Sequence, residues 1–127
     1  MSRVLIVDDD TSLRESLVAV LTVAGYSVRS APSVDAARTL LQHELSDLVL
    51  TDYRMQGGTG LDLVNLVRET APQIPIVVMT AFRSVDLAVE AMKRGARDFI
   101  TKPFDPQALL TLLRSLLSDV KSRAGEV

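Results

Sequence analysis

Short, mostly apolar segments alternate along the chain with longer segments in which hydrophobic residues recur every three or four positions. The short segments comprise residues 4–7, 26–30, 48–51, 76–80 and 98–101. A continuous apolar run of four or five residues is typical of a strand that is buried on both faces. We therefore predict five strands, of which residues 26–30 carry the weakest pattern.

The longer segments have the periodicity of amphipathic helices. Their hydrophobic positions fall within residues 13–24, 34–41, 61–67, 84–94 and 106–120. Either Asp10 or Ser12 is expected to cap the first helix, and Gly95 is expected to end the fourth. Pro106 suits the first position of the last helix. Each predicted strand is thus followed by a predicted helix.

Alternating strands and helices predict an α/β fold in which helices cover both faces of a parallel sheet. Right-handed crossovers leave few arrangements of five such units. We choose the flavodoxin-like, doubly wound (βα)5 fold with strand order 2-1-3-4-5. Residues 1–120 are expected to form this domain, and the small and polar residues 121–127 a C-terminal tail or the start of a linker.

Composition narrows the possible functions. The 127 residues fit one domain and include no cysteine, which excludes disulfides, thiolate metal sites and thiol catalysis. The 14 basic and 16 acidic side chains give no electrostatic footprint for direct nucleic-acid binding. No apolar segment is long enough to span a membrane, and the N-terminus lacks a signal-peptide pattern. We therefore expect a cytoplasmic protein without membrane contact.

Polar residues stand at the carboxyl ends of the predicted strands. Asp8 and Asp9 follow the first strand, Asp52 the third and Lys102 the fifth, and Thr80 ends the fourth. Doubly wound sheets bind ligands outside these ends, where the strand order reverses. At any single position a helix cap or a solvated charge is the simpler interpretation. All four strand ends together favour one shared polar pocket.

The residue types in this pocket indicate phosphoryl transfer. Three carboxylates at close range repel one another and require a cation, and an all-oxygen ligand set favours Mg²⁺ or Mn²⁺. A carboxylate that faces both the cation and a lysine can attack phosphorus as a nucleophile. The side chains of Lys102 and Thr80 would then bind the oxygens of the transferred phosphoryl group.

These residues lie in segments that resemble the receiver domain of two-component response regulators, namely residues 4–9, 48–52, 77–81 and 102–104. The resemblance extends from about residue 4 to residue 117 in the family's order and spacing. Residues 88–96, 98–100 and 102–105 look most like receivers of the nitrogen-regulator and nitrogen-fixation-regulator groups. The resemblance implies a signalling switch that catalyses only its own phosphorylation and dephosphorylation, rather than an enzyme.

The resemblance also implies a role for each matching position in the pocket. Asp52 matches the phosphoacceptor, which receives a phosphoryl group from a phosphohistidine of a sensor histidine kinase. Asp9 matches the direct Mg²⁺ ligand and Asp8 a ligand that acts largely through water. Asp52 and the backbone carbonyl of Arg54 complete the metal site. Lys102 matches the lysine that contacts the phosphoryl group.

Further matching positions concern how the signal is passed on. Thr80 matches the switch hydroxyl that moves toward the phosphate, and Phe99 matches the aromatic residue that then turns inward. Arg54 and Phe82 occupy positions that tune dephosphorylation in the family. The Lys102–Pro103 peptide bond is expected to be cis, as it is in the family.

The signal would reach the face formed by residues 84–94, residues 98–101 and the last helix, through which receivers form homodimers. There it would control a transcriptional output domain. The last helix fits this interpretation, because its leucines occupy more of the circumference than one core-facing stripe needs. They are Leu109, Leu110, Leu112, Leu113, Leu116 and Leu117.

The chain departs from the family after Met55. Most receivers have Pro-Gly-x-x-Gly where this chain has Gln56-Gly57-Gly58-Thr59-Gly60. The missing proline and the additional glycine predict a flexible loop. Since the Arg54 carbonyl belongs to this loop, we expect the departure to affect metal affinity and the lifetime of the phosphorylated state.

Two other functions fit parts of the pattern. Asp8-x-Asp10 after a strand resembles the nucleophile motif of magnesium-dependent phosphohydrolases of the haloacid-dehalogenase type, with Asp8 as the nucleophile. That function gives Asp52 no purpose and requires a late acidic pair that the chain lacks. A pseudo-receiver, which binds partners without being phosphorylated, is disfavoured because the expected site residues are intact.

Overall fold

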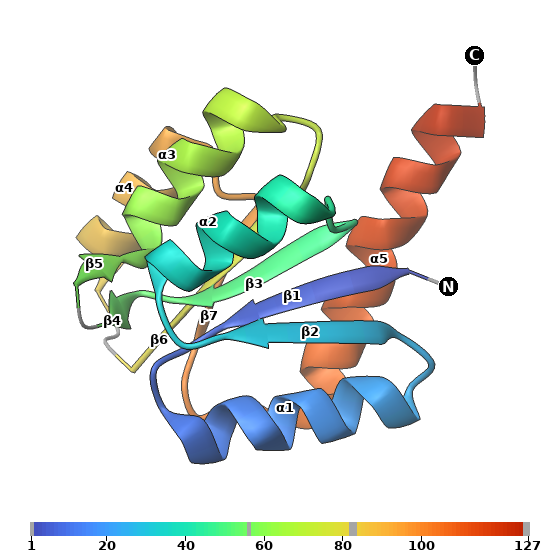
Figure 1. Ribbon diagram of the computed structural model, residues 1–127, viewed down its shortest axis with the longest axis horizontal. Coiled ribbons are helices and arrows are strands. Elements are labelled where there is room, and N and C mark those ends of the chain that lie inside the picture. Colours follow the sequence, from blue (N-terminus) through green and yellow to red (C-terminus); the bar gives the residue numbers. More distant parts are fainter. Residues whose placement is uncertain (1, 56, 82–83, 126–127) are drawn as a thin grey trace.

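The alternating pattern forms one five-stranded sheet in the computed structural model, which describes residues 2–55, 57–81 and 84–125 (Figure 1). In spatial order the strands are β2 (Ser27–Ala31), β1 (Arg3–Val7), β3 (Leu48–Asp52), β6 (Ile76–Thr80) and β7 (Asp98–Thr101). Every neighbouring pair is parallel. Because β6 and β7 are the fourth and fifth strands of this sheet, the predicted order 2-1-3-4-5 and the flavodoxin-like (βα)5 fold are confirmed.

Five helices cover the two faces of the sheet (Figure 1). They are α1 (Thr11–Val23), α2 (Val34–His43), α3 (Gly60–Thr70), α4 (Val85–Arg94) and α5 (Pro106–Gly125). Within the described ranges, no helix is both long enough and apolar enough to cross a membrane.

The sheet has a separate hydrophobic core on each face, because successive strand residues point to opposite sides. Val4 and Ile6 of β1 belong to the core that includes the buried residues of α1 and α5. Leu5 and Val7 belong to the other core, which includes the buried residues of α2, α3 and α4. A sheet buried on both faces explains why its central strands are apolar at every position rather than at every second one.

Side-chain caps fix where the helices begin. Asp10, rather than Ser12, caps α1 by accepting a hydrogen bond from the backbone N–H of Leu13 at 3.1 Å. At the start of α3, Thr59 and Asp62 form a reciprocal capping box. Helix α4 ends at Gly95, whose φ of 114° lies in the left-handed region that favours glycine.

Two short strands flank the segment for which a flexible loop is expected. Strand β4 (Arg54–Met55) pairs antiparallel with β5 (Gly58–Thr59), so that Arg54 lies opposite Thr59. Gly57 has a φ of 81°, which lets the chain turn back between the two strands. The capping box that anchors Thr59 holds the far side of the turn. Gln56 lies outside the described residues.

The last helix also extends further than its hydrophobic pattern predicts. It continues to Gly125, beyond the expected domain limit at residue 120. The division into a domain and a tail at that point remains a prediction. Four of the six leucines expected to exceed the needs of the core are buried, and Leu110 and Leu112 are partly buried against it. The core therefore uses most of this leucine surface.

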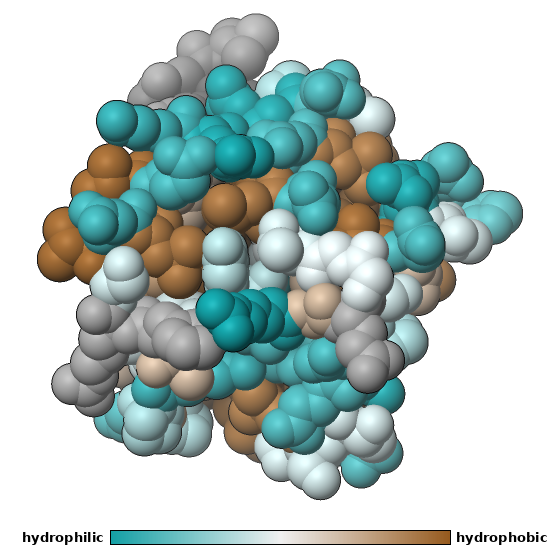
Figure 2. Space-filling view, turned by 90° about the vertical axis from the view of Figure 1, so that its left-hand side faces the viewer, coloured by the Kyte–Doolittle hydropathy of each residue, from teal (hydrophilic) through white to brown (hydrophobic). Residues whose placement is uncertain are grey.

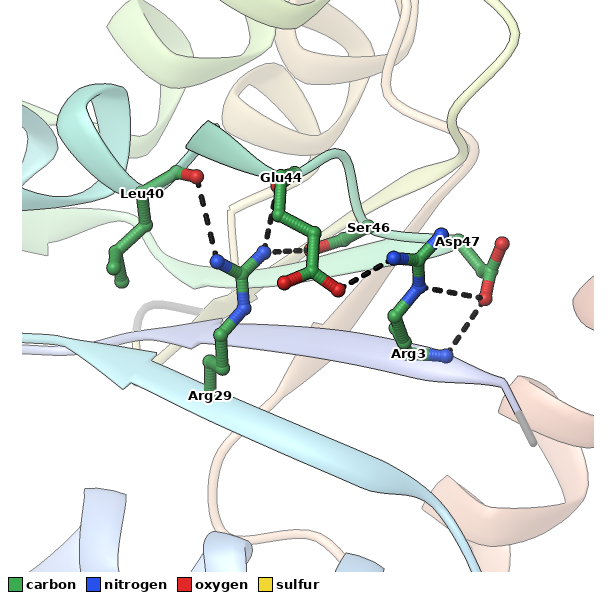
Figure 3. Close-up of polar contacts among 6 residues, drawn as sticks. All are labelled: Arg3, Arg29, Leu40, Glu44, Ser46 and Asp47. Atoms are coloured by element: carbon green, nitrogen blue, oxygen red, sulfur yellow. Dashed lines mark hydrogen bonds and ion pairs between the residues drawn. The ribbon is translucent and has the colours of Figure 1, made fainter. Parts of the chain in front are cut away.

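A polar network holds the amino ends of β1 and β3 to the end of α2 (Figure 3). The Arg29 guanidinium donates hydrogen bonds to the backbone carbonyl of Glu44 at 2.7 Å and that of Leu40 at 3.4 Å. It thereby binds the Glu44 carbonyl just beyond the helix end, and it is a second donor to the Leu40 carbonyl, which also accepts the Glu44 N–H at 3.0 Å. Arg3 pairs with Glu44, and its backbone N–H donates to the Asp47 carboxylate at 2.7 Å.

Candidate functional site

The polar side chains at the strand ends meet at one edge of the sheet. Asp8 follows β1, Asp52 ends β3, Thr80 ends β6 and Lys102 follows β7. These strands are neighbours in the order β1-β3-β6-β7 and run in the same direction. The Lys102 Nζ atom lies 3.1 Å from Asp8 Oδ2 and 3.1 Å from Asp52 Oδ1. The predicted convergence of the two carboxylates and the lysine is thus confirmed.

Asp9 joins this pair in a group of three carboxylates. One oxygen from each of Asp8, Asp9 and Asp52 lies within 4.8 Å of the others. Asp8 is fully buried, the Asp52 side chain is 13% exposed and Asp9 is exposed, so the group opens to solvent on the Asp9 side. Lys102 contacts two of the three carboxylates. A hard divalent cation fits this cluster of carboxylate oxygens.

The electrostatics of the group raise the pKa values of both Lys102 and Asp52. Burial raises the pKa of Asp52, and the neighbouring Asp8 charge raises it further, while the hydrogen bond from Lys102 opposes both effects. Burial alone would lower the pKa of Lys102, but the Asp8 and Asp52 carboxylates outweigh it, so that the pKa is raised. A cation bound beside Asp52 would therefore favour the ionised form of its carboxyl group.

Asp8 is held on several sides. Its backbone N–H donates to the Ala31 carbonyl at 3.1 Å, and its Oδ1 atom accepts from the backbone N–H of Asp10 at 2.9 Å. Its backbone carbonyl accepts a hydrogen bond from Arg14 Nη1 at 2.7 Å. The sequence pattern does not predict this arginine contact, because nothing in it distinguishes Arg14 from a solvated residue on the surface of the first helix.

The backbone around Asp52 is also tightly supported. The hydroxyl of Thr51, which is fully buried, donates to the Asp52 carbonyl at 3.0 Å. The backbone N–H of Gly60 donates to the Tyr53 carbonyl at 2.7 Å. A Cβ atom at Gly60 would lie 2.5 Å from the Asp52 carbonyl oxygen, so only glycine fits this approach. Gly60 matches the last glycine of the family's loop motif, so the sequence could have indicated this supporting position.

Thr80 and Phe99 lie on neighbouring strands. Thr80 is buried, and its backbone carbonyl accepts from the N–H of Lys102 at 2.7 Å. Phe99 stands opposite Val78 in the pairing of β6 with β7 and packs, partly buried, on the core below α2, α3 and α4. The Lys102–Pro103 bond is cis, as expected. The switch roles of Thr80 and Phe99 remain predictions.

Of the two positions expected to tune dephosphorylation, the structure describes only Arg54. Arg54 is exposed on β4, two residues after Asp52. Its proposed contribution through the backbone carbonyl remains a prediction. Phe82 lies outside the described residues.

Beside the site, a depression of about 420 Å³ is lined by Leu13, Ala81, Lys102, Pro103 and Phe104.

Comparisons with known proteins agree with this geometry. Residues 4–114 match the family described as the response regulator receiver domain. The chain is 44% identical over 115 residues to the response regulator protein PilR of Pseudomonas aeruginosa, covering 91% of this chain and 26% of PilR. It is 42% identical over 112 residues to the response regulator protein FleR of the same organism, covering 88% of this chain and 24% of FleR.

A solved structure is similar over most of its length. The beryllofluoride-activated NtrC4 receiver domain dimer has a TM-score of 0.89 and 32% sequence identity, covering 94% of this chain and 99% of that chain. The chain spans only about a quarter of the length of these two curated relatives. The similarity therefore concerns one domain of those longer proteins.

Proposed function

The chain belongs to the response regulator receiver domain family of two-component systems, and from this premise we propose that Asp52 accepts a phosphoryl group from a phosphohistidine of a sensor histidine kinase. Receiver domains are signalling domains rather than enzymes that turn over a separate substrate. The observation that carries the proposal is the placement of Lys102 Nζ at 3.1 Å from both Asp8 and Asp52. This contact makes Asp52 the partly exposed carboxylate of a charged, hydrogen-bonded site.

In the proposed reaction an Asp52 carboxylate oxygen forms a bond to phosphorus while the bond from phosphorus to the imidazole nitrogen breaks. Lys102 stays protonated and binds a phosphoryl oxygen, and the Thr80 hydroxyl binds another. A Mg²⁺ or Mn²⁺ ion held by Asp8, Asp9, Asp52 and the Arg54 carbonyl would neutralise charge on the phosphoryl oxygens. The depression that borders Lys102 offers a place for the kinase segment that carries the histidine.

We further propose that Thr80 and Phe99 carry the change to a face formed by α4, β7 and α5, and that this face forms a homodimer. The described large hydrophobic residues of α4 that are exposed are Val85, Val89 and Met92, with exposed fractions of 79%, 44% and 46%. Figure 2 looks onto the side of the molecule where α4 lies and shows hydrophobic areas beside the hydrophilic ones. The similar NtrC4 receiver domain is described as a dimer.

A transcriptional output is the final part of the proposal. PilR and FleR are response regulators of which this chain spans about a quarter, and another relative, 39% identical, is the transcriptional regulatory protein ZraR. We infer that the domain acts in the cytoplasm and controls such an output without itself contacting nucleic acid.

The test is the intact mass of the protein after incubation with acetyl phosphate and Mg²⁺. One phosphoryl group should be added to the wild type, and none should be added in EDTA or to Asp52→Ala. Asp35→Ala, which changes an exposed carboxylate on α2, is the matched control and should be phosphorylated normally. An adduct that survives Asp52→Ala but is lost in Asp8→Ala would support the phosphohydrolase instead. No adduct on the wild type would support the pseudo-receiver.

A further inference from the structure

Arg14 reaches from α1 to the loop that carries two of the three clustered carboxylates. Its Nη1 atom lies 2.7 Å from the backbone carbonyl oxygen of Asp8, and the side chain is half-buried. A hydrogen bond from a guanidinium to a carbonyl is charge-assisted and short, and it is stronger than a bond between neutral groups. The carbonyl belongs to the peptide unit that joins Asp8 to Asp9, so the contact fixes the orientation of that unit.

Further contacts of this loop hold Asp8 and Asp10, the residues on either side of Asp9. Asp8 is fastened through its N–H to β2 and through its carboxylate to Lys102. Asp10 is fastened as the cap of α1 and through its N–H to Asp8 Oδ1. A rotation of the peptide unit between Asp8 and Asp9 would swing the exposed Asp9 carboxylate away from the other two. Arg14 opposes this rotation.

We propose that Arg14 is a positioning residue of the phosphorylation site, which fixes the peptide between Asp8 and Asp9 and thereby directs the Asp9 carboxylate toward the bound cation. The inference rests on the proposed function, because it assumes that the three carboxylates bind Mg²⁺. Arg14 itself touches neither the cation nor the phosphoryl group in this role.

The sign of the effect separates positioning from simple electrostatics. A guanidinium near a cation site repels the cation, so removal of its charge alone should strengthen Mg²⁺ binding. Loss of positioning should weaken binding, because groups that orient metal ligands commonly contribute about tenfold or more to affinity. We therefore expect Arg14→Met to weaken Mg²⁺ binding about tenfold. Arg14→Lys, which keeps both charge and donor, should restore most of the affinity.

The experiment is a calorimetric titration of each folded variant with Mg²⁺, together with ¹H–¹⁵N NMR spectra recorded in EDTA. Arg38→Met is the matched control, because it removes one exposed positive charge from a different helix, α2, where Arg38 pairs with Asp35. It should bind Mg²⁺ as the wild type does. In EDTA the Asp9 amide signal should shift in Arg14→Met and lie near its wild-type position in Arg14→Lys. Arg14→Ala repeats the test with the whole side chain removed.

The outcomes distinguish this inference from the proposed function. If the wild type binds Mg²⁺ but Arg14→Met and Arg14→Ala bind it equally well or more tightly, the positioning role is wrong and the phosphorylation site stands. An unchanged Asp9 amide signal in Arg14→Met would also overturn the positioning role. If the wild type neither binds Mg²⁺ nor is phosphorylated by acetyl phosphate, the proposed function fails, and the role of Arg14 fails with it.

Discussion

At the scale of single residues, the site depends on groups that hold the reactive ones as much as on the reactive ones themselves. Lys102 links the carboxylates of Asp8 and Asp52, and the Thr51 hydroxyl supports the backbone of Asp52. Gly60 is required because the chain passes against the Asp52 carbonyl. Substitutions at the support positions should therefore change the site without removing a reactive group.

Gly60→Ala is expected to destabilise the protein by about 1–3 kcal/mol, because its Cβ would force the backbone of Asp52 to shift. Phosphorylation by acetyl phosphate should slow as well. Gly58→Ala is the control: its Cβ would meet mainly the side chains of Val34 and Asp62, at 3.2 Å and 3.3 Å, and these have more freedom to move. Urea unfolding of the two variants measures the difference. Equal stability of both would contradict the close approach at Gly60.

Mg²⁺ should stabilise the wild type, because a ligand that binds only the folded state raises the melting temperature. Asp9→Asn should abolish most of this increase, whereas Asp35→Asn should retain it. In EDTA, Asp9→Asn should be at least as stable as the wild type, since it removes one of three mutually repelling charges. Melting curves with and without Mg²⁺ measure both effects. A full Mg²⁺ response in Asp9→Asn would exclude Asp9 as a ligand.

At the scale of elements, the five strands of the main sheet and the helices could be predicted from the sequence. The strands are continuous apolar runs because the sheet is buried on both faces, and the helices show a clear hydrophobic periodicity because one side of each packs on a core. The β4–β5 hairpin could not be predicted, since glycine-rich segments suggest mobility and the pairing of Arg54 with Thr59 depends on the anchored cap of α3. The hydrogen bond from Arg14 to the Asp8 carbonyl could not be predicted from the sequence either, because its acceptor is a backbone atom. Such contacts leave no pattern of residue types.

The end of α2 offers a further test at this scale. Arg29→Met should lower the free energy of unfolding by about 1–2 kcal/mol, because it leaves the Glu44 and Leu40 carbonyls and the buried Ser46 hydroxyl without this donor. Arg38→Met removes an exposed pair with Asp35 and should cost less than about 1 kcal/mol. Urea unfolding at one pH compares the two variants. A larger loss in Arg38→Met would contradict the capping role of Arg29.

At the scale of the whole molecule, the candidate site lies at the carboxyl ends of the strands. The network that joins Arg3 to Glu44 and Asp47 lies where β1 and β3 begin (Figure 3). The apolar residues that α4 exposes lie on a third region of the surface. Burying them between two copies of the chain would favour association.

We expect the beryllofluoride-treated protein to dimerise and Val89→Lys to weaken the dimer at least tenfold, because the charge would have to be buried at the interface. Leu45→Lys is the matched control, since Leu45 is 46% exposed between α2 and β3, outside the proposed face. Sedimentation velocity measures both variants. A dimer disrupted by Leu45→Lys and not by Val89→Lys would place the interface elsewhere.

The reactive centre unites residues from both ends of the chain, since the lysine lies 94 positions after the first aspartate that it contacts. Among the described strands, β7, which precedes this lysine, lies at the edge of the sheet beside β6. A chain still emerging from the ribosome holds its aspartates long before it can supply the lysine, and so cannot assemble the centre. A chain that ends before residue 102 therefore lacks the ammonium that contacts Asp8 and Asp52. The proposed phosphoryl-acceptor site is complete only once β7 has joined the sheet.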